Sequence, residues 1–253
     1  MSAKAFKKNK EFFAIGVILI ILVLGVASCV SGISMFLRQS EYFIIQEVAS
    51  KNNEFNLSYL KGRNIFSVDL RALSLQLENR YSGYSKIRIT RLLPGILWVD
   101  FLKRSPVAFV KLYRYFYTDE EGVLFLCEEN SPVTGMPVIT GLDTKIFGAQ
   151  SGKKYQVREL KLAIEIATAF REKKSLKGYA LREIDASPPE GFSCMIYPLP
   201  FGRGIEVRFD LADLKEKISL LGNLLNQSSK SNINIKYVDL RFKEPAIKFY
   251  ETD

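Results

Sequence analysis

One long apolar segment dominates the amino-terminal part of the chain. Residues 12–37 are 26 consecutive positions without a charged side chain. An α-helix rises about 1.5 Å per residue, so about 20 residues cross a hydrocarbon layer of about 30 Å. The pattern therefore predicts a transmembrane helix over residues 12–37, with a short tail over residues 1–11 before it and a linker over residues 38–41 after it.

The charges that flank this segment predict its orientation. Four lysines precede the segment, namely Lys4, Lys7, Lys8 and Lys10. Only Arg38 and Lys51 follow within a comparable stretch. Because the flank richer in Lys and Arg stays in the cytoplasm, we expect a cytoplasmic amino terminus and an extracytoplasmic body.

A second interpretation of the same segment stays open. The sequence Val26-Ala27-Ser28-Cys29 fits a bacterial lipobox, in which the cysteine is lipidated and the preceding residues are removed. The following residues 30–37 remain apolar, which favours an uncleaved anchor. Both interpretations place the same body outside the cytoplasm.

The first half of the body has the pattern of a helix between strands. Leu70, Leu73, Leu77 and Tyr81 form one apolar stripe, which predicts a helix over residues 68–81. Alternating positions predict strands over residues 42–48, 86–92, 96–102, 107–112, 114–118 and 123–126, with a hairpin turn at Leu93-Pro94-Gly95. We expect a core built by Leu70, Leu73, Leu77, Ile87, Ile89 and Val99.

The second half of the body repeats this mixture with longer helices. Helices are predicted over residues 157–173 and 211–225, the latter from apolar positions at helical spacing and from Asp210 as its amino-terminal cap. Strands are predicted over residues 179–185, 194–197, 204–209, 232–240 and 246–250. The whole pattern indicates an α+β protein with a mostly antiparallel sheet and helices packed on one face.

Composition narrows the possible chemistry. The chain has no histidine, which removes Ser-His-Asp and Cys-His catalytic pairs and histidine metal ligands. The net charge is +9, but the residues flanking the apolar segment carry much of it, so we expect no nucleic-acid partner. We expect no metal and no cofactor.

The motifs that could carry catalysis have simpler explanations. Ser58-Tyr59-Leu60-Lys61 and Ser151-Gly152-Lys153-Lys154 match the S-x-x-K of serine acyl-enzymes, but the S-D-N and K-T-G companions are absent from the sequence. Asp119-Glu120-Glu121 precedes Gly122 in a predicted turn, which is typical of a solvated hairpin.

The cysteine count leaves one pairing open. With Cys29 in the anchor, only Cys127 and Cys194 could pair in an oxidising compartment. The sequence alone does not decide between a disulfide and two buried thiols.

Several short motifs, taken in order, resemble one protein family. They are residues 62–70, residues 89–94, residues 103–108, Asp119 with Gly122, and Tyr237-Val238-Asp239-Leu240-Arg241. Their order and spacing are similar to those of the FtsQ/DivIB family of bacterial cell-division proteins. The resemblance implies a POTRA domain over residues 42–113 and a β domain over residues 114–253.

The resemblance also implies a function. Such a protein is a non-enzymatic divisome scaffold of the inner membrane at the division septum, which binds FtsB and FtsL and recruits or regulates septal peptidoglycan synthesis. Other division proteins would bind the POTRA domain and the membrane helix. The alternative is a POTRA-bearing assembly or transport factor of the envelope.

The carboxyl-terminal strand is the expected binding site. The family receives FtsB by strand addition at this edge, and the resemblance places the contact residues at Phe242, Ala246, Ile247, Lys248, Phe249 and Tyr250. An edge strand carries unpaired N–H and C=O groups, so an extended segment of another chain can continue the ladder. The alternative is that Phe249 and Tyr250 only cover the core of their own sheet.

Overall fold

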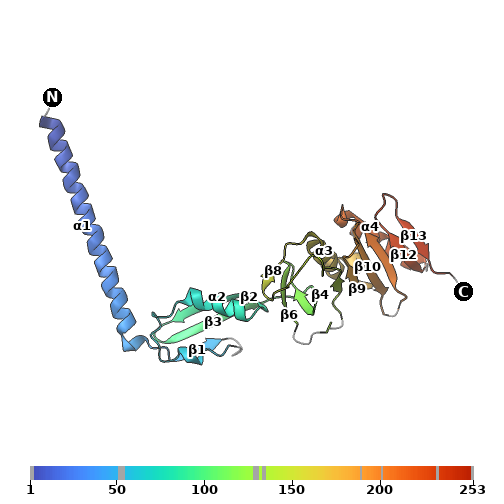
Figure 1. Cartoon of the computed structure of the whole chain (residues 1–253), viewed down its shortest axis with the longest axis horizontal. Helices are drawn as coiled ribbons and strands as arrows, with labels where there is room; N and C mark the ends of the chain where they lie inside the picture. The colour runs from blue at the N-terminus through green and yellow to red at the C-terminus, as the bar shows by residue number, and fades with distance from the viewer. Residues whose placement is uncertain are drawn as a thin grey trace. The chain divides into compact units, whose positions relative to one another are not determined.

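The chain divides into two compact units (Figure 1). The computed structural model describes residues 3–50, 55–127, 131–132, 135–188, 190–200, 202–231 and 234–251. The first unit contains Met1–Leu77 and Lys86–Phe101, and the second contains Glu78–Ser85 and Leu102–Asp253.

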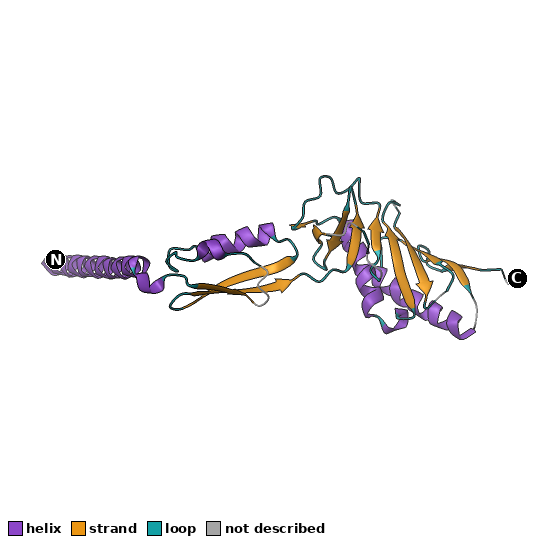
Figure 2. Cartoon of the chain, turned by 90° about the horizontal axis from the view of Figure 1, so that it is seen from below, coloured by secondary structure: helices purple, strands orange, loops and turns teal. Residues whose placement is uncertain are grey.

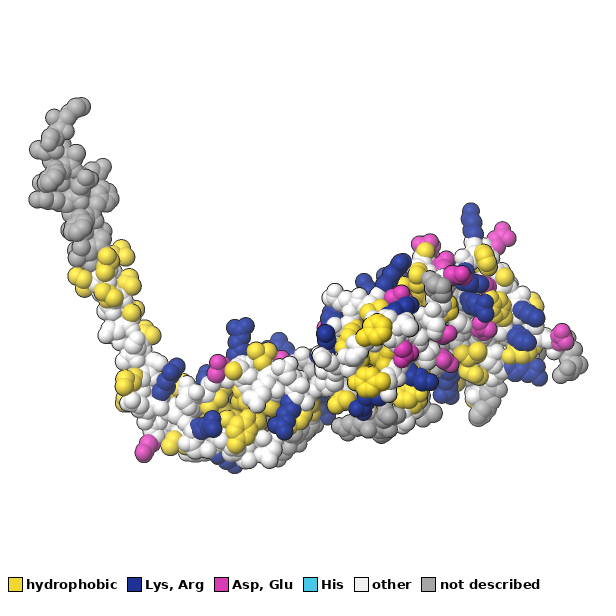
Figure 3. All heavy atoms as spheres, in the orientation of Figure 1, with side chains coloured by type: hydrophobic (Ala, Val, Ile, Leu, Met, Phe, Trp, Pro, Cys, Tyr) yellow, Lys and Arg dark blue, Asp and Glu magenta, His cyan; other side chains and the backbone are white. Residues whose placement is uncertain are grey.

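A single long helix, α1 (Ala3–Gln39), begins the first unit. Its segment Leu19–Gln39 is long and apolar enough to cross a membrane, and none of it is buried inside the protein. Hydrophobic side chains gather along the described part of this helix (Figure 3). The prediction of a helix over residues 12–37 is confirmed, whereas the side chains of the four flanking lysines lie outside the described part of the chain.

Asn64 satisfies the carboxyl-terminal end of α1. Its side-chain amide donates hydrogen bonds of 2.9 Å to the carbonyl oxygens of Leu37 and Ser40. The last carbonyls of a helix have no partner within the helix, so a side-chain donor replaces the missing bonds.

The body of the first unit is a three-stranded sheet with one helix. The strands are β1 (Glu47–Ser50), β2 (Tyr84–Leu92) and β3 (Ile96–Lys103), in the order β1-β3-β2, and β1 runs parallel to β3. The helix α2 (Leu70–Arg80) lies over the sheet (Figure 2). Short 3-10 turns occur at Glu41–Phe43 and Ser58–Leu60.

The predicted core of this unit is largely confirmed. Five of the expected residues are buried, namely Leu73, Leu77, Ile87, Ile89 and Val99. Leu70 is only half-buried because it stands at the first position of α2. Leu97, which is fully buried, was not predicted.

The first strand begins later than its sequence predicts. Residues 42–48 have the alternation and β-branched content of a strand, but Glu41–Phe43 form a 3-10 turn and β1 begins at Glu47. The Ser40 hydroxyl accepts a hydrogen bond from the Tyr42 amide, and this local cap competes with extended structure.

The second unit is built on a ten-stranded sheet. Its strand order is β13-β12-β11-β10-β9-β7-β4-β5-β6-β8. The strands are β4 (Ala108–Lys111), β5 (Tyr115–Thr118), β6 (Val123–Leu126), β7 (Val138–Thr140), β8 (Lys153–Lys154), β9 (Tyr179–Asp185), β10 (Phe192–Pro198), β11 (Ile205–Phe209), β12 (Ile235–Asp239) and β13 (Ala246–Phe249). Most neighbours are antiparallel, whereas the pairs β4–β7, β7–β9 and β11–β12 are parallel.

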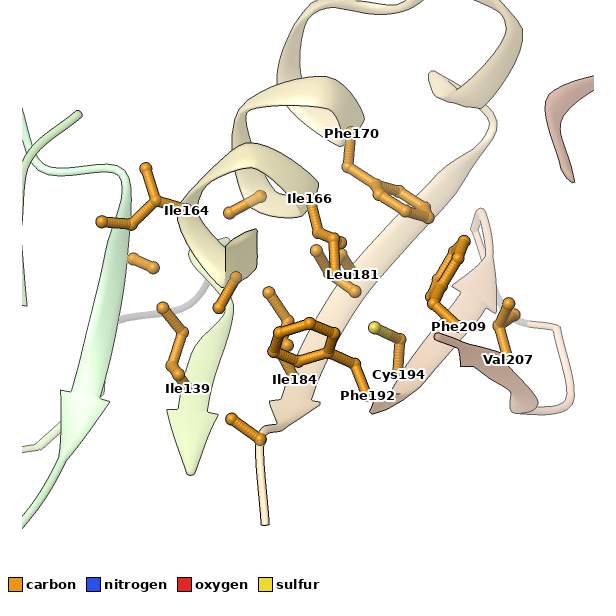
Figure 4. Packing of buried hydrophobic residues seen from close by; sticks show 14 of the residues in the cluster. Ile139, Ile164, Ile166, Phe170, Leu181, Ile184, Phe192, Cys194, Val207 and Phe209 are labelled. Carbon is orange, nitrogen blue, oxygen red and sulfur yellow. The ribbon is translucent and has the colours of Figure 1, made fainter. Parts of the chain in front are cut away.

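Two helices cover one face of this sheet. α3 (Arg158–Glu172) and α4 (Leu214–Ser231) lie on the same side of the strands, and a short 3-10 turn follows α3 at Lys174–Leu176 (Figure 2). Ile166 and Phe170 of α3 pack with Leu181 of β9 and with the side chains of the neighbouring strands (Figure 4). The predicted α+β architecture is confirmed.

The predicted cap of α4 is wrong by three residues. The Asp210 carboxylate accepts a hydrogen bond from the Ala212 amide, and α4 begins at Leu214. Asp213, which adopts a positive φ of 51°, accepts the first helical hydrogen bonds through its carbonyl. A turn therefore separates Asp210 from the helix that it was expected to cap.

Candidate functional site

The carboxyl-terminal strand forms one edge of the ten-stranded sheet. β13 pairs only with β12 among the described strands, in an antiparallel register that sets Val238 opposite Ile247 and Asp239 opposite Ala246. The ladder shifts by one residue between Ile235 and Tyr237. One long side of β13 is therefore open.

The backbone hydrogen bonds show which groups of β13 face the open side. The Tyr250 amide donates to the Asn234 carbonyl at 2.9 Å, so Tyr250 faces β12. In an antiparallel strand the backbone groups of successive residues point to opposite sides. The backbone N–H and C=O groups of Lys248 therefore also face β12, and those of Ile247 and Phe249 face outward.

The register on the far side of β12 agrees with this alternation. The Leu240 amide donates to the Arg208 carbonyl of β11 at 2.8 Å. The backbone groups of Leu240 and Val238 therefore point towards β11. Those of Tyr237 and Asp239 point towards β13 and can hydrogen-bond with it.

The predicted contact residues do not form one continuous surface. Phe242 is 61% exposed and Phe249 is 48% exposed, and Ala246 and Lys248 are also exposed. Ile247 lies opposite Val238 and packs against the core that the helices cover. The structure thus brings Ala246, Ile247, Lys248 and Phe249 together on β13, while Phe242 stands in the preceding loop.

Tyr250 is held within its own fold. Its hydroxyl donates to the Gly204 carbonyl at 2.8 Å. The guanidinium carbon of Arg203 and the ammonium of Lys236 lie 5.1 Å and 5.7 Å from the centre of its ring. These contacts make Tyr250 a residue that fixes the end of β13, and its side chain is only half-exposed.

A polar network lies on the sheet face opposite the helices, beside this edge. The Tyr237 hydroxyl donates to the Asp239 carboxylate at 2.7 Å, and the Arg241 guanidinium contacts the same carboxylate at 2.8 Å. Arg241 also pairs with Glu190 at 3.1 Å. The carbon at the centre of its guanidinium lies 5.7 Å from the ring centre of Phe242.

A second ion pair joins the network from β11. The Arg208 guanidinium donates to Glu206 at 2.9 Å and lies 5.3 Å from the ring centre of Tyr237. The Ser193 hydroxyl of β10 donates to Glu206 at 3.2 Å. The network therefore connects three strands to the loop that carries Phe242.

Electrostatics fix the protonation states of this network. Hydrogen bonds from Arg241 and Tyr237 hold the pKa of Asp239 well below its ordinary value, at about 2, although its burial acts in the opposite direction. Burial, together with the hydrogen bond to Asp239, raises the pKa of the Tyr237 hydroxyl. At neutral pH the carboxylate is charged and the phenol keeps its proton.

Asp239 and Arg241 belong to the motif Tyr237–Arg241 of the sequence, but their network was not predicted from it. The spacing of Tyr237 and Asp239 gave a signal, because residues i and i+2 of a strand lie on one face. The contributions of Glu190 and Glu206 depend on long-range register and had no such signal.

The candidate catalytic groups are occupied by structural contacts. The Asp119 carboxylate pairs with Arg104 at 2.6 Å and is nearly buried, and Glu120 pairs with Arg171 at 2.5 Å. The Ser58 hydroxyl donates to Asn56, and the Ser151 hydroxyl donates to Ser82. No described group of three or more acidic or cysteine side chains could hold a metal ion.

The two body cysteines are free thiols in the structure. Cys127 and Cys194 are both buried, and Cys194 lies in the core between the sheet and the helices (Figure 4). Burial raises the pKa of the Cys194 thiol far above its ordinary value, so it stays protonated.

These features define a class of protein: an α+β protein with one apolar helix long enough to cross a membrane and a sheet that ends at the edge strand β13. A family model described as cell division protein FtsQ/DivIB, C-terminal, matches residues 108–241, which is more than half of the chain. The chain therefore belongs to the FtsQ/DivIB family of cell division proteins. The matched span ends before Phe242 and β13.

Several relatives carry the same family name. The cell division protein FtsQ of Syntrophotalea carbinolica is 24% identical over 229 residues, which cover 86% of this chain and 77% of the relative. FtsQ of Geotalea daltonii is 22% identical over 188 residues, or 74% of this chain and 66% of the relative. This chain thus spans just under two thirds of the Geotalea protein.

Proposed function

We propose that this cell division protein is a non-enzymatic scaffold that binds an FtsB/FtsL-type partner by strand addition at β13. Through that partner it recruits or regulates septal peptidoglycan synthesis. The observation that carries the proposal is the open edge of β13, where Ile247 and Phe249 direct their backbone groups away from β12. Strand addition takes its affinity from such groups and its specificity from alternate side chains.

Exposed aromatic side chains next to the edge support the same site. Phe249 stands on the strand itself, and Phe242 stands in the loop that leads to it. Truncating a buried aromatic anchor typically costs about 2 kcal/mol of binding free energy or more. We propose Phe242, Ala246, Ile247, Lys248 and Phe249 as direct contacts, and Tyr250 as the residue that holds the edge in position.

The polar network beside Phe242 gives the proposal a specificity element. Arg241 and Glu190 leave part of their charge at the surface, since the Glu190 side chain is 75% exposed. The loop that carries Arg241 and Phe242 leads from β12 into β13, so partner residues that extend past the Ala246 end of β13 are the ones that would meet Arg241. Charge complementarity at such a rim sets partner choice more than affinity.

The location and domain plan follow the family and the anchor. We propose a single-pass protein of the bacterial inner membrane at the septum, with residues 1–11 in the cytoplasm and the body outside. The lysine-rich flank before the apolar segment supports this orientation. We also propose a division into a POTRA domain over residues 42–113 and a β domain over residues 114–253. The boundary between them is the weaker part of this proposal, because β4 pairs with β5 and β7 of the larger sheet.

Other division proteins would contact the POTRA domain and the membrane helix. The alternative function, a POTRA-bearing assembly or transport factor, loses support because the family is one of cell division proteins.

Substitutions on β13 test the proposal through main-chain and side-chain contacts separately. Phe249→Ala removes the aromatic anchor and keeps the outward N–H, whereas Phe249→Pro also removes that N–H. The outward position of this group makes proline tolerable, because no bond to β12 is lost. We expect partner capture by the full-length protein to weaken with alanine and to disappear with proline, while thermal unfolding stays close to wild type.

A matched control lies one residue away. Lys248→Pro removes an N–H that faces β12, so it should destabilise β13 itself. Full partner capture by both Phe249 variants, with their folds intact, would exclude β13 as the docking edge.

A further inference from the structure

The ten-stranded sheet contains a gap in its interior. β7 is only three residues long and lies between β4 and β9. It pairs with Glu183, Ile184 and Asp185 of β9, which leaves the first four residues of that strand, Tyr179–Arg182, without a strand partner on this side among the described residues. Two strands that flank a third are about 9.6 Å apart, so the gap has the width of one strand.

A cavity of about 520 Å³ occupies this position. One wall is Pro106 with Val107, just before β4, and the other is Tyr179–Arg182. Gly135, Met136 and Pro137 close the end where β7 begins, Ala167 and Phe170 of α3 form the floor, and Arg171 of the same helix stands at the rim. We call this space the β9 notch.

The lining of the β9 notch combines three chemistries. Its floor is apolar, since Ala167, Phe170 and Leu181 are buried core residues. Its β9 wall is an unpaired strand edge that offers backbone N–H and C=O groups. Its rim carries Arg182, which is exposed and makes no ion pair with any described residue.

The second rim cation is less available than the first. Arg171 lines the same cavity, but its guanidinium already contacts Glu120 and Glu172. Among the described lining residues, Arg182 is therefore the group that would meet a ligand anion.

We propose that the β9 notch is a second peptide-binding site, which takes an extended segment of about four residues from an extracytoplasmic partner protein. The segment adds to β9 beside Tyr179–Arg182 and seats one apolar side chain on Phe170. An aspartate or glutamate of the segment pairs with Arg182. At about 3.3 Å per residue, four residues match the unpaired length of β9.

This site is separate from the β13 edge. β9 and β13 are separated by β10, β11 and β12 in the strand order, so one short segment cannot occupy both. A partner bound at β13 leaves the β9 notch free for a second chain.

Hydrogen exchange of the full-length protein in detergent micelles tests the proposal. The probe is an eight-residue peptide with a valine–leucine–valine centre flanked by one glutamate on each side. We expect it to slow amide exchange at residues 179–182 by about tenfold and to leave residues 246–250 unchanged. The control peptide, in which lysines replace the glutamates, should leave both segments unchanged.

A charge swap makes the assignment specific. Arg182→Glu should weaken the glutamate peptide about tenfold and improve the lysine peptide by a similar factor. Lys153→Glu, an equal charge change at an exposed position of β8, should alter neither. Arg182→Gln, which has no charge, should weaken the glutamate peptide without improving the lysine peptide.

Two results would overturn the proposal. One is unchanged exchange at residues 179–182 with saturating glutamate peptide, including the case in which only β13 becomes protected. The other is an Arg182→Glu variant that melts like wild type and binds both peptides as wild type does.

Discussion

The Arg241 guanidinium fixes the Asp239 carboxylate at the end of β12, with Nη2 2.8 Å from Oδ2 and Nε 3.0 Å from Oδ1. Asp239 is only 3% exposed, so its charge depends on these donors and on the Tyr237 hydroxyl rather than on water. Because β13 pairs with β12 at this residue, the same contact supports the strand that carries the proposed docking edge.

Acidification should remove the contribution of this carboxylate to stability. Folding lowers the pKa of Asp239 from 3.8 to about 2, chiefly through the Arg241 hydrogen bond. A carboxyl with a depressed pKa stabilises the folded state above its ordinary pKa and loses that effect as the pH falls towards the folded value. We expect a loss on the order of 1 to 2 kcal/mol between pH 4 and pH 2, allowing for solvent screening at the strand end.

Urea unfolding of the wild type and of Asp239→Asn over this pH range measures the effect. The asparagine variant should be less stable at pH 7 and should lose less stability on acidification. An equal acid loss in both proteins would show that Asp239 does not carry this pH dependence.

The helix face of the first unit gives a second prediction. Leu73 is 6% exposed in α2, whereas Leu75 of the same helix is 52% exposed. Leu73→Ala should lower the free energy of unfolding by about 2 to 5 kcal/mol, because it leaves a cavity. Leu75→Ala should change it by less than about 0.5 kcal/mol. Denaturant midpoints of the two variants measure these changes. Similar losses of unfolding free energy in both variants would mean that α2 packs on the sheet through a different face.

Sequence alone located the elements whose pattern is local. β6 and β9 have the bounds that were predicted, and α3 differs by one residue at each end. In α3 the buried residues recur at helical spacing, whereas β6 is buried at three consecutive positions, so the turn residues before it, and not alternation, located this strand. β7 and β8 were not predicted, since two or three residues are too short to show a period.

The candidate site at β13 could be predicted only in part from the sequence. The edge position of β13 was expected from its place late in the chain, but which of its residues face outward depends on the register with β12 and on the one-residue shift there. Tyr250 was expected to contact the partner, yet its bonds to Gly204 and Asn234 involve residues that no local pattern connects to it. Whether it also contacts a partner stays a prediction.

The buried thiols give a third prediction. Cys127 and Cys194 are free and buried, and the Cys194 thiol is held in its protonated form. Neither should react with a thiol reagent in the native protein, and both should react after unfolding. Mass spectrometry of the alkylated protein measures this, and a mass that shows a disulfide between them would contradict it.

The amino-terminal anchor gives a fourth prediction. The helical, apolar continuation of α1 past Cys29 favours an uncleaved chain with a free Cys29 thiol. The intact mass of the protein extracted from membranes should show that the residues before Cys29 are retained and that Cys29 carries no lipid. A mature chain that begins at a diacylated Cys29 would replace the membrane helix with a lipid anchor.

Residue-resolved amide exchange on β13 tests the central claim most directly. In the free protein, the Lys248 and Tyr250 amides should exchange slowly because they face β12, while the Ile247 and Phe249 amides exchange fast. Addition of the FtsB-type partner should slow Ile247 and Phe249 and leave the other two unchanged. Saturating partner that leaves Ile247 and Phe249 in fast exchange would contradict strand addition at this edge.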